Sequence, residues 1–520
     1  MTQGNMDRTI PARGVGLQPL YFLIALCLTQ IAAWTLVPAY TYSALPLDVA
    51  ENYAWGPHWF IGSYKHPALP SWLLELSRLL TGTTGWPAYL LSQLSIALTF
   101  FFVFVLGRRE IGAERAIIAT LLLPWIYYFG WHTPTFNHDI VQLPLWAGLS
   151  LATWRAVETH RTVWWLAVGA IGALVLYGKL SSGLVLLAAA VWIVFDGRGR
   201  QALAARGPWL GLALFLILIT PIYFWLFGSE ASPLNYAIER GGRQSKSQVE
   251  FAVIQLAIAA GVTLPVLLLG ALERIWPSRA TPAIHHPVVP RFKAFLLVMT
   301  CVPLASTIFV TAVAGTGVKL MWGVPMLTLT GLLAVVWLPD RWMQFSTGRL
   351  AALSCAFVVA LALIHGAVTA RDPNSSRRLK RASWPQAEIS ARMHGIFAAK
   401  TGKPLQIIAG RMDNWVPSLI AVSRGDVRDI YTAADRTLSP WVTPERQTKH
   451  GVLAVWEEPE CGVPDELVAL VAGRPIGFED FVLSPTGRVF PLKIAYVIVD
   501  DTAEAPSSAH PLLPPLALVQ

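Results

Sequence analysis

Two carboxylates lie three residues apart directly after the first long apolar run of this chain, in the stretch "LDVAENYAWGPHWFIGSYKHPALPSW". Asp48 and Glu51 are followed in the same stretch by Lys65 and His66, and the next prolines, Pro67 and Pro70, hold these two residues in a rigid turn. A carboxylate can deprotonate an attacking hydroxyl, and a fixed cation stabilises the charge that builds on a departing phosphate. We therefore take Asp48 and Glu51 as candidate catalytic residues for transfer from a phosphate-linked donor, with Lys65 as a candidate phosphate ligand.

A simpler interpretation of the same stretch needs no chemistry. Asp-x-x-Glu is a capping box, in which Asp48 would accept the backbone N–H of Glu51 and open a helix that lies in the membrane interface. Lys65 would then be an interfacial lysine that pairs with lipid phosphate. On this interpretation four aromatic residues form the membrane seat of the helix: Tyr53, Trp55, Trp59 and Phe60.

The composition indicates a membrane protein. Of the 520 residues, 54% are hydrophobic and 14% charged, well below the charge of an ordinary soluble domain. The net charge of +9 does not indicate nucleic-acid binding, because the arginines lie in short clusters between apolar runs. Most of the chain should therefore lie in a lipid bilayer.

Apolar runs long enough to cross a bilayer recur through most of the sequence. They predict a mostly α-helical, polytopic fold with eleven transmembrane helices, near residues 18–40, 86–106, 114–131, 138–154, 162–178, 180–195, 208–227, 251–271, 294–312, 319–338 and 349–369.

The orientation follows from the charges between these runs. One set of alternate connections, which includes the N-terminus, holds sixteen Lys and Arg residues, and the other set holds seven. The first set should be cytoplasmic. Eleven crossings then place the loop of residues 41–85 and everything after residue 370 in the periplasm of a bacterium, with the helices in its inner membrane.

From residue 371 the composition is that of a soluble domain. "WPQAEISARMHGIFAAKTGK" has helical spacing, whereas "PLQIIAG", "GVLAVWEE" and "LKIAYVIVDD" are typical of short buried strands. We expect a transmembrane catalytic domain over 1–370, a small α/β domain over 371–501 and a flexible tail over 502–520.

Further charged residues fall on the same predicted face as Asp48. Asp139 opens the fourth run and Lys179 separates the fifth from the sixth, so both are candidates to line a cavity, together with Tyr64 and His66. A helix-dipole acid and an interfacial lysine explain Asp139 and Lys179 equally well.

Cations also gather where positive charge is otherwise scarce. Arg240, Arg243 and Lys246 lie in the loop of residues 228–250, and Lys319 precedes the tenth run. We predict that these four bind the phosphate of a lipid-linked donor; anionic lipid headgroups are the alternative.

The acid in the first extracytoplasmic loop, the aromatic-rich helix, "GSYKHPALPSW" and the later crossings together resemble the bacterial membrane glycosyltransferases of the GT-C fold. The closest group is that of protein O-mannosyltransferases and aminoarabinose transferases. The resemblance implies a polyprenyl-phosphate sugar as donor, inversion at the anomeric carbon, and Asp48 as the base. It also implies that Asp139 and Lys179 line the cavity behind the base.

The sequence departs from this group at one position. A second acid is expected later in the loop, where this chain has Lys65 and His66. That acid would be the natural metal ligand, so a divalent metal stays an open question, with His58 and His66 as substitutes. No other cofactor is indicated.

Three functions remain to be compared. The leading prediction is a glycosyltransferase that acts on a hydroxyl of a lipid, glycan or protein. A transporter or flippase of lipid-linked sugars would usually show an internal repeat. A periplasmic glycan ligase or polymerase would differ mainly in taking a diphosphate-linked donor.

Overall fold

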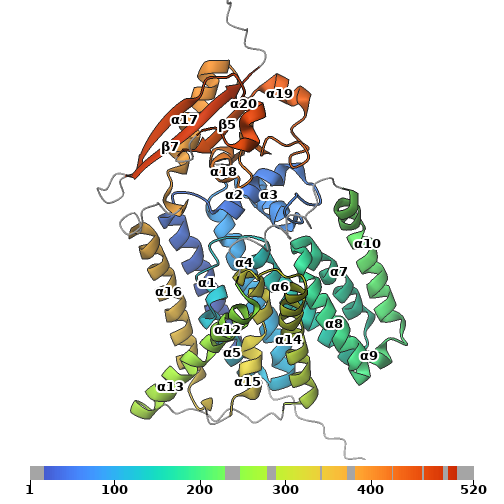
Figure 1. The fold of residues 1–520 in the computed structure, drawn as a ribbon. Helices are drawn as coiled ribbons and strands as arrows, with labels where there is room; N and C mark the ends of the chain where they lie inside the picture. The colour runs from blue at the N-terminus through green and yellow to red at the C-terminus, as the bar shows by residue number, and fades with distance from the viewer. Residues whose placement is uncertain are drawn as a thin grey trace, which may run out of the picture. The chain divides into compact units, whose positions relative to one another are not determined.

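The computed structural model describes residues 17–228, 246–277, 288–339, 342–371, 381–423, 425–458, 462–483 and 490–500. These residues divide into two compact units (Figure 1). One unit is helical and ends at Trp384, and the other begins at Pro385 and contains a mixed sheet. The fold is therefore mostly α with a small C-terminal α/β part, as predicted.

The helical unit follows the order of the apolar runs. Its α-helices are α1 (Gln18–Thr41), α2 (Leu47–Trp55), α3 (Leu69–Thr81), α4 (Trp86–Ile111), α5 (Ala113–Leu121), α6 (His138–Thr159), α7 (Thr162–Gly178), α8 (Gly183–Phe195), α9 (Gly197–Ala202), α10 (Arg206–Gly228), α12 (Gln248–Ala259), α13 (Thr263–Ile275), α14 (Pro290–Val313), α15 (Thr330–Trp337) and α16 (Thr347–Arg371). Short 3₁₀ turns join several of them, among them η4 (Leu180–Ser182), η6 (Leu320–Gly323) and η7 (Pro325–Leu327).

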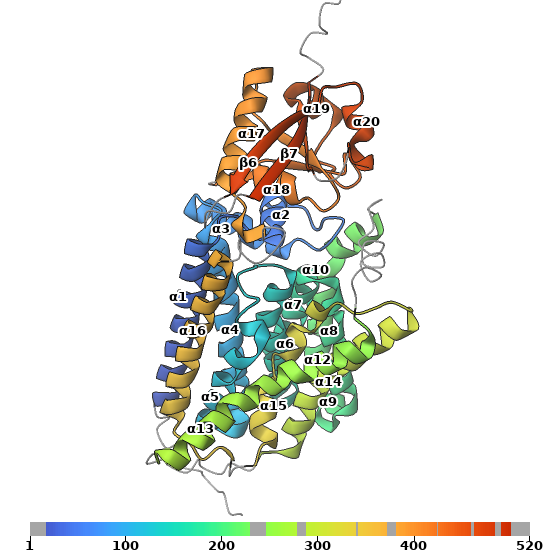
Figure 2. The same cartoon turned by 60° about the vertical axis from the view of Figure 1, so that its left-hand side comes forward.

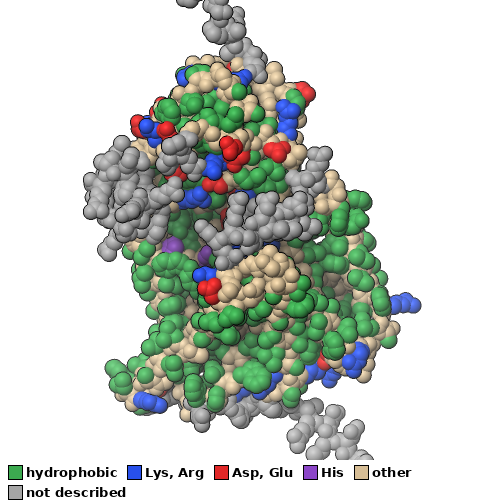
Figure 3. All heavy atoms as spheres, viewed as in Figure 1, with side chains coloured by type: hydrophobic (Ala, Val, Ile, Leu, Met, Phe, Trp, Pro, Cys, Tyr) green, Lys and Arg blue, Asp and Glu red, His purple; other side chains and the backbone are tan. Residues whose placement is uncertain are grey.

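The length and composition of these helices are those of a multi-pass membrane protein. Among the described residues, six helical segments can cross a bilayer, and a bent pair over Leu320–Leu327 and Thr330–Trp337 would make a seventh. On the face seen in Figure 3, hydrophobic side chains cover most of the helical unit, and Lys and Arg side chains lie along its lower edge. The predicted count of eleven crossings is not confirmed.

The predicted helix over 114–131 is only half helical. α5 ends at Leu121, and 3₁₀ turns follow. Polar side chains of α1 and α4 bind the irregular backbone: Gln30 donates to the Phe129 carbonyl (3.0 Å) and Ser92 to the Thr133 carbonyl (2.5 Å). Non-helical backbone is tolerated at membrane depth when protein groups satisfy its hydrogen bonds. An apolar run alone does not distinguish this arrangement from a continuous helix.

The predicted helix over 319–338 is also interrupted, with a bend of 57° between its two parts. Its regular half, α15, packs against α5, where a Cβ on Gly331 would stand 2.0 Å from the Ala119 carbonyl oxygen. Only glycine permits so close an approach of two backbones. The two half-helices thus pack together, and each continues into irregular backbone.

α6 is almost entirely enclosed by other parts of the helical unit. It packs against α4 on one side and α7 on the other (Figure 2), and nearly all of its side chains are buried. α2 and α3 pack on each other in the connection between α1 and α4. The first loop is therefore an ordered pair of helices.

The second unit contains a five-stranded sheet in the order β4-β1-β5-β7-β6. β1 pairs in parallel with β4 and β5, whereas β7 is antiparallel to β5 and β6. Its elements are α17 (Gln386–Thr401), β1 (Ile407–Gly410), α18 (Trp415–Ala421), β2 (Val422–Ser423), β3 (Asp426–Val427), β4 (Asp429–Thr432), α19 (Pro444–His450), β5 (Val452–Glu457), α20 (Val468–Val471), β6 (Gly477–Leu483) and β7 (Phe490–Val499). The helix and the three strands predicted from the sequence are confirmed as α17, β1, β5 and β7.

Candidate active site

The start of α6 is where the candidate residues meet. Asn137 precedes the helix in an extended conformation, and its side-chain oxygen accepts the backbone N–H groups of Asp139 (2.9 Å) and Ile140 (3.2 Å). Asparagine is a favoured N-cap because it satisfies these otherwise unbonded donors. The cap fixes the direction in which the first turn of α6 presents its side chains.

The amide nitrogen of Asn137 reaches the candidate base. Asn137 Nδ2 donates to Asp48 Oδ2 at 2.8 Å, and Asp48 is half-buried in the first turn of α2. α2 is itself fixed on α3, because Asn52 donates to the Asp48 carbonyl (2.6 Å) and Ser71 donates to Asn52 (2.7 Å). The carboxylate of Asp48 therefore has a defined position next to α6.

The predicted capping box is wrong. α2 begins at Leu47 after Pro46, and no side chain caps it, so Asp48 is already inside the helix. Glu51 pairs with Lys65 instead, at 2.5 Å between Oε1 and Nζ. A residue inside the first turn cannot take the extended conformation that an N-cap needs. The two carboxylates thus have different neighbours in spite of their spacing.

Lys65 is enclosed on several sides. Its side chain is 9% exposed, and its Nζ lies 5.8 Å from the Trp55 ring centroid and 5.4 Å from that of Tyr64. Trp55 and Tyr53 are buried in the protein, so the prediction that they seat α2 in lipid is wrong. Trp59, by contrast, is 51% exposed. Aromatic type alone did not show which rings face outward.

The turn that carries Lys65 and His66 also contacts α6. The rings of His66 and His138 lie 4.2 Å apart between centroids, and His138 Nε2 is 3.0 Å from the Pro67 carbonyl oxygen. His66, placed by prediction near a cavity, is therefore beside the first residue of α6.

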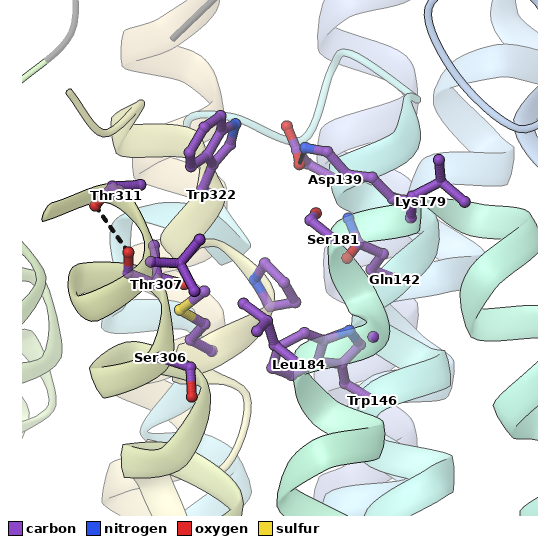
Figure 4. A pocket seen from close by; sticks show the side chains of 15 residues that line it. Asp139, Gln142, Trp146, Lys179, Ser181, Leu184, Ser306, Thr307, Thr311 and Trp322 are labelled. Carbon is purple, nitrogen blue, oxygen red and sulfur yellow. Dashed lines mark hydrogen bonds and ion pairs between the residues drawn. The ribbon is translucent and has the colours of Figure 1, made fainter. Parts of the chain in front are cut away.

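The other predicted pair forms within a cavity wall. Lys179 Nζ lies 2.7 Å from Asp139 Oδ1, and each side chain is 12% exposed. Both residues line a cavity of about 270 Å³ between α6, η4 and α8 on one side and α14, η6 and η7 on the other. Figure 4 shows Trp322, Thr307 and Thr311 across this cavity from Asp139 and Gln142. Below the ion pair, the lining is mainly apolar.

Other groups near the site bear on its charge. Burial raises the pKa of Tyr53 to about 12, which keeps its hydroxyl neutral. The two enclosed cations are each met by a carboxylate, Lys65 by Glu51 and Lys179 by Asp139.

The remaining predicted cations are only partly described. Lys246 and Val318 form an antiparallel bridge with two N–H···O bonds of 2.9 Å, which brings the chain before α12 next to Lys319. Lys246 is exposed and lies 3.9 Å from Glu250, and Lys319 is half-buried. Arg240 and Arg243 lie outside the described residues. The assignment of these four to a phosphate stays a prediction.

No grouping of three or more His, Cys, Asp or Glu side chains with the geometry of a metal site occurs in the described ranges. The nearest approach to one at the site is the pair of His66 and His138, whose rings pack against each other. These residues thus define no metal position.

Two functional residues escaped the sequence analysis. Asn137 holds Asp48, and Gln142 lines the cavity while donating to the His138 carbonyl at 2.6 Å. The run "FNHDIV" did contain a readable signal, because an asparagine before an apolar helix is typical of an N-cap. Its contact with Asp48 could not be read, since the two residues are 89 positions apart.

A family model matches part of the chain. Residues 65–225 match the family model of dolichyl-phosphate-mannose-protein mannosyltransferase, a range that includes Lys65, Asp139 and Lys179 but not Asp48. No curated protein matches the chain.

Solved structures match most of the chain. The structure of ArnT from Cupriavidus metallidurans bound to undecaprenyl phosphate has a TM-score of 0.58 and 15% identity, over 92% of this chain and 98% of that one. The same protein in the apo state gives 0.56 and 15%, over 92% and 97%.

These likenesses confirm the predicted resemblance. The chain has the GT-C fold of membrane glycosyltransferases. Within that class it is similar to the group of protein O-mannosyltransferases and aminoarabinose transferases.

Proposed function

We propose that this protein is an inverting glycosyltransferase that moves a sugar from a polyprenyl phosphate to a hydroxyl of a lipid, glycan or protein. The observation that carries the proposal is the arrangement around the start of α6. There Asn137 binds the half-buried carboxylate of Asp48, and Asp139, two residues further on, pairs with Lys179 in the wall of a mainly apolar cavity. His138, between them, packs against His66, the neighbour of the enclosed Lys65.

The reaction is a single displacement. Asp48 takes the proton of the acceptor hydroxyl as its oxygen attacks the anomeric carbon, and the bond from that carbon to the phosphate oxygen breaks. The sugar is transferred with inversion, and the polyprenyl phosphate leaves with the electron pair of the broken bond. General-base help of this kind is commonly worth about 10² to 10⁴ in rate.

Lysine charges stabilise the leaving phosphate. Lys65 approaches the site from the proline-braced turn, and Lys179 from the start of η4. Both side chains are largely withdrawn from solvent, where a fixed cation stabilises developing negative charge more strongly than in water. Glu51 and Asp139 hold the two lysines in place.

The cavity suits the isoprenoid next to the phosphate. Leu180, Leu184 and Met326 are among its apolar lining residues, and the ion pair lies at one end. An apolar pocket with a few convergent polar groups is the usual form of a small-molecule site. The likeness of fold to an ArnT structure bound to undecaprenyl phosphate supports a donor of this class.

We place the site on the periplasmic side of a bacterial inner membrane, with the N-terminus in the cytoplasm. The charge count between the apolar runs supports this orientation. Thr448→Cys in an otherwise cysteine-free chain tests it, because this exposed residue of the second unit should react with a membrane-impermeant maleimide in intact cells. Labelling only after lysis would contradict the orientation.

The test of the function compares envelope lipids and glycans by mass spectrometry. A deletion strain should lack one sugar substituent, wild type should restore it, and Asp48→Asn at the same level should not. Asp426→Asn is a matched control, because Asp426 is an exposed carboxylate of the second unit. Full restoration by Asp48→Asn would contradict the proposal.

A separate assay tests whether the donor is a monophosphate or a diphosphate. Purified protein is incubated with short-chain polyprenyl phosphates or diphosphates that carry mannose, glucose or aminoarabinose, with membranes of the deletion strain as acceptor. Transfer from a monophosphate supports the proposal, and transfer from diphosphates alone indicates a ligase or polymerase. Movement of the donor from one leaflet of a vesicle membrane to the other, without transfer of its sugar, indicates a flippase.

A further inference from the structure

Asn137 makes two kinds of contact at once. Its side chain is buried, with the residue only 6% exposed, between the first turn of α6 and the carboxylate of Asp48. Its oxygen accepts two backbone N–H groups of α6, and its nitrogen donates to Asp48 Oδ2. The side-chain amide of Asn137 thus caps α6 and also binds the candidate base.

The helix determines the orientation of that amide. Backbone N–H groups can only donate, so the side-chain atom that faces Asp139 and Ile140 has to be the oxygen. The NH₂ group then necessarily faces Asp48 Oδ2. A flipped amide would place two donors against each other at α6 and two acceptors against each other at Asp48.

The choice of asparagine is therefore informative. Serine, threonine and aspartate cap helices about as well. An ionised aspartate cannot donate a hydrogen bond, and serine is too short to span from the helix to Asp48. A cap alone does not require asparagine here, whereas a cap that also donates to a carboxylate does.

We infer that Asn137 is a positioning residue for the transfer reaction: through its hydrogen bond to Oδ2 it directs Oδ1 of Asp48 toward the acceptor hydroxyl. This inference rests on the proposed function. Across the described part of the chain, Oδ1 of Asp48 has no hydrogen-bond partner, so this oxygen is available to take a proton.

The same amide links the base to the donor cavity. Asn137 fixes the first turn of α6, which carries Asp139, and Asp139 pairs with Lys179 in the cavity wall. One side chain therefore sets the base and the ion pair relative to each other. A shift of α6 at this point would separate the base from the phosphate site.

Two variants separate the cap from the contact with Asp48. Asn137→Asp keeps the cap but sets a second carboxylate against Asp48, and two carboxylates so close do not both ionise readily. Asn137→Ser keeps the cap and loses the donor. Asn137→Ala loses both and shows the cost of the cap itself.

The variants are assayed for transfer from short-chain polyprenyl-phosphate sugars, normalised to folded protein. We expect kcat to fall about 10-fold for Asn137→Ser and about 10²-fold for Asn137→Asp at pH 7, with the donor KM nearly unchanged. The acid limb of the kcat/KM profile should move to higher pH in Asn137→Asp, so that part of the activity returns on raising the pH. Melting temperatures of both should stay close to wild type.

Two results would overturn the inference. One is a wild-type kcat and pH profile in Asn137→Asp. The other is a loss of activity in all three variants that follows the loss of folded protein, with no change in the pH profile, which would reduce Asn137 to a helix cap.

Asp48→Asn, assayed in parallel, separates this failure from that of the proposed function. If Asp48→Asn is inactive and Asn137→Asp behaves as wild type, only the role of Asn137 is wrong. If Asp48→Asn is as active as wild type, the proposed function and the role of Asn137 are both wrong.

Discussion

α6 carries a cluster of charges near each end, and Asp139 and Glu158 are separated by about 28 Å along the helix axis. At its start, Asp139 pairs with Lys179, and Asp48 accepts a hydrogen bond from a neutral amide. At its end, Glu158 contacts Arg291, which also forms two bonds with Asp196, at 2.6 and 2.7 Å.

The two clusters differ in how their charges are neutralised by neighbouring groups. Arg291 has carboxylates on two sides, and its guanidinium lies over the rings of Trp154 (4.9 Å) and Trp192 (5.5 Å). The charges at the start of α6 stand instead at a cavity, and one of the carboxylates has no cation bonded to it among the described residues. We therefore expect the end of α6 to serve stability and, under the proposed function, its start to serve the transfer reaction.

The largest loss of stability is expected at the end of α6, around Arg291. Arg291→Ala leaves Glu158 and Asp196 without their shared cation. Loss of one partner of a fully buried ion pair costs about 3–5 kcal/mol, and Arg291 is 21% exposed, so we expect a loss near the lower end of this range. Thermal unfolding in detergent should show this loss, whereas the transfer rate per folded molecule should stay at the wild-type value. A large drop in that rate with normal stability would contradict the division between the two ends.

The Asp139 and Lys179 pair should differ from this cluster, because its loss should affect the transfer rate as well as stability. We expect Lys179→Gln to lower the transfer rate about 10²-fold, as for removal of a group that stabilises transition-state charge, and to destabilise the protein by leaving Asp139 unpaired. The double variant Asp139→Asn/Lys179→Gln removes both charges, so it should regain stability but not activity.

Comparison of the single and double variants shows whether the pair of Asp139 and Lys179 serves stability or transfer. Activity that returns together with stability would show that the pair is structural, like the cluster around Arg291. Stability is measured by thermal unfolding and activity by transfer from the short-chain donors.

Glu51→Gln sharpens the distinction between the two carboxylates of α2. Glutamine keeps an acceptor for Lys65 Nζ but removes the charge that competes with a phosphate for this lysine. We expect the donor KM to fall about threefold, with kcat within about threefold of wild type. A loss of kcat as large as that of Asp48→Asn would make Glu51 a catalytic residue in its own right.

The sequence allowed prediction of the helices that depend on composition. α1, α4, α10, α14 and α16 match continuous apolar runs, because a bilayer imposes length and hydropathy on any helix that crosses it. α5 and α15 could not be predicted in this way, since buried irregular backbone has the same apolar composition. Their conformation depends on distant partners such as Gln30.

The site was predictable in residue type but not in pairing. Asp48, Lys65, Asp139 and Lys179 stand out because charged residues near apolar runs are costly. The partner of Glu51 was misjudged, because local spacing favoured a capping box whereas the fold brings Lys65 to it from 14 positions away. Asn137 carries no charge, so the sequence indicates at most a helix cap, and only the long-range contact shows its link to Asp48.

The smallest loss of stability is expected for a second arginine at the end of α6, Arg198. It serves as a control for Arg291. Arg198 contacts Glu158 at 2.7 Å, and Arg291 contacts the same carboxylate. The side chain of Arg198 is 56% exposed, whereas that of Arg291 is 21% exposed. An exposed ion pair is worth about 0.2–1 kcal/mol, because water screens it and ordering a long side chain costs entropy. Arg198→Ala should therefore lower the unfolding free energy by about 0.5 kcal/mol and leave transfer unchanged. If Arg198→Ala costs as much as Arg291→Ala, then the shared carboxylate determines stability at this end of α6, and the packing of Arg291 over two tryptophan rings does not.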